Sequence, residues 1–100
     1  MADKNIQMGF TEGTYYERLY DSSLSLIKTI EKGLQKCYSL SDLTSVKELI
    51  TVVEGSSSVM AKLYSNYFGN EVAPEVIGLN DKLSSIRHRV LSLENSLKSP

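Results

Sequence analysis

The stretch Thr51–Tyr64, TVVEGSSSVMAKLY, decides the fold. Its glycine and three serines are common in linkers, but they also occur in phosphate-binding loops and inside helices. A phosphate-binding loop needs a second glycine five residues after the first, followed by lysine and then serine or threonine. Met60 and Ala61 occupy the second glycine and lysine positions after Gly55, so the stretch does not encode such a loop.

An apolar stripe passes through this stretch without losing phase. Its residues alternate steps of three and four, which keeps them on one face of an α-helix. A linker has no reason to keep this phase, and Gly55 costs only about 1 kcal/mol relative to Ala inside a helix. We therefore predict one helix over residues 40–68. Its stripe is Leu43, Val46, Ile50, Val53, Ser57, Met60, Tyr64 and Tyr67.

The same spacing predicts two further helices, over residues 14–38 and 73–98. Thr14 and Glu17 form a capping box at the start of the first, and Pro74 suits the first turn of the last, where its missing N–H is harmless. The stripes are Tyr16, Tyr20, Ser23, Ile27, Ile30, Leu34 and Cys37 in the first helix and Val72, Val76, Leu79, Leu83, Ile86, Val90, Leu93 and Leu97 in the last.

Turn and capping residues mark both ends of the middle helix. Ser39 is predicted to cap its start, with Asp42 at the third helical position and Tyr38 packed against Leu43. The sequence Phe68–Asn70 is predicted to end it, because glycine at this position favours chain reversal after a helix.

A short turn at residues 39–41 makes the first two helices antiparallel neighbours. Folding about residue 40 places every stripe residue opposite a partner, for example Tyr16 opposite Tyr64. The two polar exceptions, Ser23 and Ser57, also fall opposite each other. Their hydroxyls can hydrogen-bond together or to their own helix carbonyls, which lowers the cost of burying them.

The last helix is predicted to fold back along the middle one about residues 71–72, with Tyr64 opposite Leu79. A register one heptad shorter leaves almost no residues for the turn. The sequence therefore predicts an all-α, up-down-up antiparallel three-helix bundle with coiled-coil-like spacing, formed by residues 14–100. Residues 1–13 carry no such pattern and are predicted to be a flexible N-terminal arm.

Composition indicates a soluble, cytoplasmic protein of one domain. The 100 residues are 41% hydrophobic and 23% charged, which is typical of a globular chain. A net charge of -1 disfavours a nucleic-acid surface, and no run approaches the ~20 apolar residues of a membrane span. The single cysteine, Cys37, rules out an intrachain disulfide and favours a reducing compartment.

Few residues suggest catalytic or metal chemistry, and we expect no enzyme activity, cofactor or metal. His88 stands between Arg87 and Arg89, without a second ligand one helical turn away. Cys37 occupies the apolar stripe, where a buried thiol is more common than a nucleophile. The carboxylates that an acid–base pair would need all lie off the stripes: Glu17, Glu31, Glu48, Glu54 and Glu94.

Lys82, Arg87 and Arg89, with Lys98 beyond them, carry positive charge along the last helix. They suggest an anion or nucleotide site, or a solvated outer face, because acidic residues are interleaved with them. A group of tyrosines at the bundle end opposite the first turn could likewise frame a pocket or simply pack. These tyrosines are Tyr15, Tyr16, Tyr20, Tyr64 and Tyr67.

A second apolar seam on the middle helix exceeds what one bundle needs. It lies about 100° around the helix from the first stripe. Exposed apolar patches usually mark interfaces, and Gly55 and Ser56 would allow two helices to approach closely. The predicted interface residues are Leu49, Val52, Gly55, Ser56, Val59 and Leu63.

We therefore expect a non-enzymatic helical assembly or adaptor protein. Its first partner would be itself, as a dimer or higher oligomer, and its second another protein. Two other functions remain open from the sequence. One is a helical oligomer that binds a small molecule or nucleotide, and the other is a viral or phage accessory protein that blocks a host factor.

Overall fold

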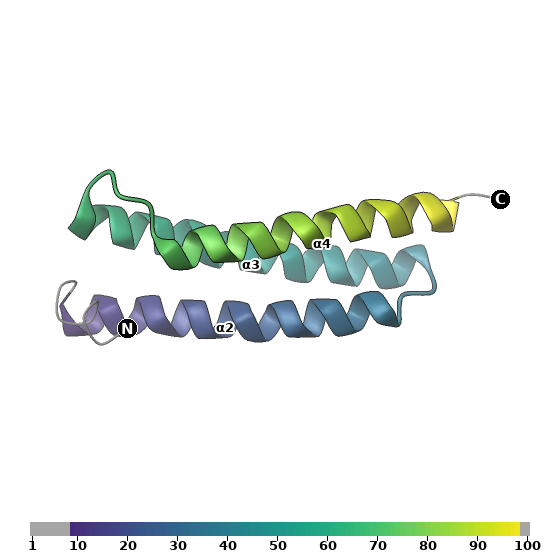
Figure 1. The fold of residues 1–100 in the computed structure, drawn as a ribbon. Coiled ribbons are helices and arrows are strands. Elements are labelled where there is room, and N and C mark those ends of the chain that lie inside the picture. The colour runs from purple at the N-terminus through teal and green to yellow at the C-terminus, as the bar shows by residue number, and fades with distance from the viewer. Residues whose placement is uncertain (1–8, 99–100) are drawn as a thin grey trace.

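Three long helices lie side by side in the computed structural model, which describes residues 9–98 (Figure 1). They are α2 (Phe10–Gln35), α3 (Leu40–Phe68) and α4 (Pro74–Lys98). Short connections reverse the chain twice, and each helix contacts both of the others. The Cα atoms extend over 55 × 22 × 15 Å. The predicted all-α, up-down-up three-helix bundle is confirmed.

The three apolar stripes meet in one continuous core. On α3 the buried residues run at steps of three and four from Leu43 to Tyr64, through Ser57 and past the exposed Gly55. The spacing also predicts Tyr67 and Val72 in the stripes, but they are 42% and 64% exposed. Tyr67 lies in the last turn of α3, and Val72 lies in the link before α4 begins. Neither is buried by a neighbouring helix.

Helix α2 begins earlier than predicted. It starts at Phe10, and the backbone N–H of Gly13 bonds the carbonyl of Gly9 at 3.0 Å. Gly9 has φ 83°, a conformation that favours glycine, and its position has no side-chain cap. The predicted capping box at Thr14 therefore lies inside the helix, and residues 10–13 are not an arm. Gly9 of the predicted arm is the N-cap of the helix, and residues 1–8 lie outside the described residues.

The turn between α2 and α3 is held by local hydrogen bonds. Ser39 Oγ accepts from the backbone N–H of Asp42 at 3.1 Å, so the predicted cap is confirmed. Asp42 Oδ2 accepts from the N–H of Tyr38 at 3.0 Å, and this bond lowers the pKa of Asp42. The Tyr38 ring, predicted to pack on Leu43, is instead 79% exposed. Helix α2 ends at Gln35, so Cys37 lies buried in the turn.

The link between α3 and α4 confirms both predicted boundary signals. Gly69 follows the last residue of α3 with φ 66° and ψ −128°, a region that side chains make costly. Pro74 is the first residue of α4, and the N–H of Ile77 bonds the carbonyl of Ala73 at 3.1 Å. The buried Ala73 thus precedes the helix and adds to the core.

The observed contacts match the predicted pairing of α2 with α3 but fit the predicted pairing of α3 with α4 only in part. Tyr16 and Tyr64, predicted to be opposite, have ring centroids 6.2 Å apart. Between α3 and α4, Glu54 pairs with Arg87. This pair lies two residues from the preferred register, which places Arg89 opposite Glu54. The hydrogen bond between Ser57 and Asn80 instead lies one residue from the shorter register, so the contacts between α3 and α4 fall between the two.

The two buried serines share the core but not a hydrogen bond. Ser57 Oγ donates to Asn80 Oδ1 of α4 at 3.3 Å. Ser23 Oγ is buried and has no partner among the described residues. A buried hydroxyl without a partner loses its water hydrogen bonds and gains nothing in return.

We expect Ser23→Ala to stabilise the protein by about 1 kcal/mol or more, because it removes this unpaired hydroxyl and favours the helix. Ser57→Ala is the matched control, since it removes a hydroxyl that is hydrogen-bonded, and it should give no such gain. Urea unfolding followed by circular dichroism measures both. A loss of stability in Ser23→Ala equal to that in Ser57→Ala would contradict the expectation.

Candidate interaction surface

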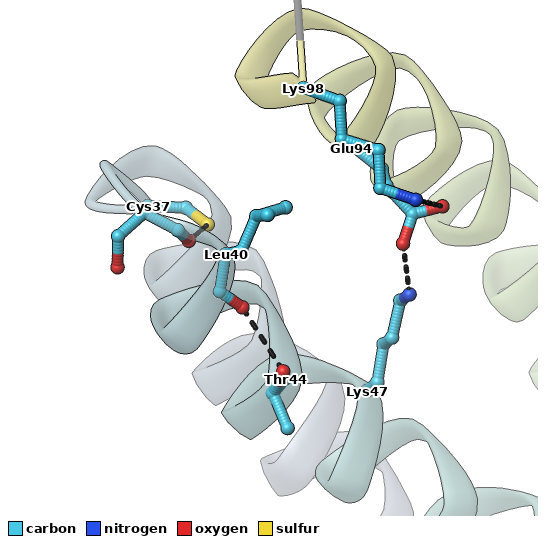
Figure 2. A network of polar contacts seen from close by, with 7 residues as sticks. Cys37, Leu40, Thr44, Lys47, Glu94 and Lys98 are labelled. Carbon is cyan, nitrogen blue, oxygen red and sulfur yellow. Dashed lines mark hydrogen bonds and ion pairs between the residues drawn. The ribbon is translucent and has the colours of Figure 1, made fainter.

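The flank between α3 and α4 is closed by ion pairs. Lys47 pairs with Glu94, which also lies near Lys98 (Figure 2). Further along the flank, Glu54 pairs with Arg87. The hydrogen bond from Lys47 lowers the pKa of Glu94, because it stabilises the ionised carboxylate. The charged residues on this side of α3 therefore pair within the same chain.

The flank between α2 and α4 carries mixed charge. A shallow depression there is lined by Glu31 of α2 and by Asp81, Lys82 and Arg89 of α4. The structure therefore divides the predicted anion-binding residues. Lys82 and Arg89 lie on this flank beside two acids, whereas Arg87 lies on the other side of α4 and pairs with Glu54.

The middle of the flank between α2 and α3 is apolar. Leu19 and Leu26 of α2 and Leu49 and Leu63 of α3 are partly buried and pack against the core. Gly33 also belongs to this side, and a Cβ there would lie only 3.2 Å from Val46 Cγ2, so the two helices are close. Leucine side chains close the middle of this flank, and Lys36 and Asp42 line its end near the turn.

The structure separates the predicted interface residues into two groups. Leu49 and Leu63, with the partly buried Ser56, lie toward α2 and serve the chain's own packing. The other three residues lie further around α3: Val52 is 52% exposed, Val59 is 38% exposed, and Gly55 is exposed. A Cβ built at Gly55 meets no atom within 4 Å, so the space above it is open.

Two charged residues, omitted from the predicted interface, continue this exposed row. Glu48 and Lys62 are exposed and fall in step with the valines at intervals of three and four residues. Their spacing from the valines is visible in the sequence, but an apolar pattern does not include charged residues. We call the row the outer seam, and it consists of Glu48, Val52, Gly55, Val59 and Lys62.

The remaining residues that could take part in catalysis or metal binding do not form a site in the described part of the chain. His88 is exposed, as predicted, and the buried Cys37 thiol donates to the carbonyl of Ser39 at 3.7 Å. Across residues 9–98 there is no group of three His, Cys, Asp or Glu side chains that could hold a metal ion.

Part of the tyrosine group at the far end of the bundle packs in the core, as one of the two interpretations predicts. Tyr16 and Tyr64 are buried, and Tyr64 stacks on Phe68 with centroids 4.4 Å apart. Tyr16 Oη donates to Glu75 Oε1 at 2.7 Å, which ties the start of α4 to α2. Burial, followed by this carboxylate, raises the pKa of Tyr16. Tyr15 is largely exposed.

Comparison of the chain with family models, curated proteins and solved structures finds no match. Within the described residues, no helix is long and apolar enough to cross a bilayer. The function is therefore inferred from the surfaces of the bundle itself.

Proposed function

We propose that this protein is a non-enzymatic helical assembly or adaptor protein that acts through self-association. The outer seam of α3 is the surface by which it binds further copies, and a second protein partner would use the same kind of helix contact. We place the protein in the cytoplasm, where an unpaired cysteine such as Cys37 stays reduced.

One observation carries the proposal. The outward face of α3 combines two exposed valines, Val52 and Val59, with an open space over Gly55 between them. Valine gains about 1.5 kcal/mol or more on full burial, and a glycine between two such positions lets another helix come close. The alternative of an anion-binding protein has less support, because Arg87 already pairs with Glu54 and acids neighbour Lys82 and Arg89.

Concentration-dependent thermal stability tests the proposal. If folding is coupled to association, mass action raises the melting temperature as protein concentration rises. We expect an increase of several degrees over a hundredfold range, because each tenfold step adds about 1.4 kcal/mol per dimer. Scanning calorimetry or circular dichroism at fixed salt measures it. A melting temperature that stays constant over this range would contradict self-association.

A further inference from the structure

The outer seam of α3 has a near-symmetric order about Gly55. Glu48 and Lys62 each lie seven residues from Gly55, and Val52 and Val59 lie three and four residues from it. Reversing the direction exchanges Glu48 with Lys62, and it exchanges Val52 with Val59 to within one residue. A row with this order is self-complementary, as a contact between two identical surfaces related by a two-fold axis must be.

We infer that two copies pair through their α3 helices in antiparallel orientation, about a two-fold axis at Gly55. The inference rests on the proposed self-association and adds its geometry. Glu48 of each copy then lies against Lys62 of the second copy, and Val52 lies against Val59. The two glycines face each other at the axis.

Charge favours this orientation over a parallel one. The other charged residues of α3 are used inside the chain: Asp42 at the cap, Lys47 with Glu94, and Glu54 with Arg87. Among the described residues, Glu48 and Lys62 form no ion pair and are exposed. Antiparallel pairing joins these two residues twice, whereas parallel pairing would set Glu48 against Glu48 and Lys62 against Lys62.

The backbone at Gly55 permits the close approach that the axis requires. No atom of the chain lies within 4 Å of the position of a Cβ there. Helices that pack at about 8–10 Å between axes, each with Cα atoms at a radius of about 2.3 Å, bring facing Cα atoms within about 6 Å. The seam spans about 21 Å at ~1.5 Å per residue. A crossing angle near 20° keeps its ends in contact over that length.

The residues one step beyond each end of the seam also fall opposite each other in the antiparallel pairing. The next positions at these steps are Ser45 before Glu48 and Asn66 after Lys62, and both are exposed. The antiparallel pairing sets Ser45 opposite Asn66 of the second copy. Two small polar side chains there can hydrogen-bond at the rim while the valines lie near the centre.

Charge reversal tests the register. We expect Glu48→Lys alone, and Lys62→Glu alone, to weaken the dimer about tenfold, because each replaces two attractions by two repulsions. The double variant Glu48→Lys with Lys62→Glu should recover the native dissociation constant. Sedimentation equilibrium at low salt measures all three, and circular dichroism checks that the exposed substitutions leave the helices intact.

Crosslinking tests the axis. In a Cys37→Ala background, Gly55→Cys should form an interchain disulfide under mild oxidation, because two cysteines at the axis meet the required Cα separation of about 4–7 Å. Gly78→Cys is the matched control, since Gly78 is another helical glycine with open space around its Cβ position. It should stay uncrosslinked at the same protein concentration.

These outcomes separate the two proposals. A dimeric protein that shows neither rescue in the double variant nor crosslinking at Gly55→Cys would overturn the antiparallel pairing and leave self-association standing. A protein that is monomeric in the native state would overturn both.

Discussion

Tyr16→Ala is expected to destabilise the bundle by about 3–5 kcal/mol, a large part of the 5–15 kcal/mol typical of a whole domain. The Tyr16 side chain is 0% exposed, so its removal opens a cavity that the neighbouring helices cannot fill without shifting. It also removes the 2.7 Å hydrogen bond to Glu75 and the ring contact with Tyr64. Urea unfolding followed by circular dichroism measures the loss.

The adjacent tyrosine gives a matched control. Tyr15 is 49% exposed, so Tyr15→Ala should cost about 0.5 kcal/mol or less. Equal losses at the two positions would contradict the placement of Tyr16 as the residue that joins α2 to the start of α4.

Tyr16 should also make the fold sensitive to alkali. Its pKa is raised in the fold, so the phenol stays neutral there while the same group ionises in the unfolded chain near pH 10.0. The stability that this group contributes is complete below pH 10.0 and falls as the pH rises above it. Tyr16→Phe should lose stability less steeply between pH 10 and pH 12. Identical slopes for the two proteins would contradict the assignment.

The double variant Val52→Glu with Val59→Glu is expected to weaken self-association more than about hundredfold. Each substitution removes about 1.5 kcal/mol of valine burial and places a carboxylate where another chain would exclude water. In a two-fold dimer each change occurs twice. The helix content should stay native, because both positions are exposed in the single chain. Analytical ultracentrifugation beside circular dichroism measures both quantities.

The matched control is Ile77→Glu with Leu91→Glu on α4. These residues are exposed to a similar degree, 47% and 56%, but do not belong to the outer seam. The control should keep the native mass. If it dissociates and the α3 variant does not, the contact surface lies on α4.

Periodicity was sufficient to predict most of the fold. The stripe through Gly55 and the serines predicted that α3 is one continuous helix, since only a helix keeps apolar residues in this phase over several turns. Pairing followed because the short turn at Ser39 leaves one antiparallel register in which Tyr16 meets Tyr64. Local chemistry was enough at Ser39, Gly69 and Pro74.

The predictions from the sequence were wrong where tertiary contacts decide how far a helix extends and which residues it buries. Thr14 and Glu17 have the spacing of a cap, but the helix continues through them to Phe10. Val72 keeps the apolar spacing but precedes the helix that would bury it. Spacing within a helix cannot show where the neighbouring helix begins.

The candidate surface was predicted only in part for a similar reason. From the sequence, Leu49 and Leu63 look equivalent to Val52 and Val59, since all four continue one seam. The structure turns the leucines toward α2 and leaves the valines outside. Which side of α3 carries α2 depends on the handedness of the bundle, and a stripe pattern does not specify it.

Sedimentation equilibrium of the native protein tests the central claim most directly, because the antiparallel pairing also depends on association between copies. We expect a concentration-dependent mass that approaches twice the 11.1 kDa of one chain at high concentration. A mass of 11.1 kDa at every concentration up to the millimolar range would contradict self-association.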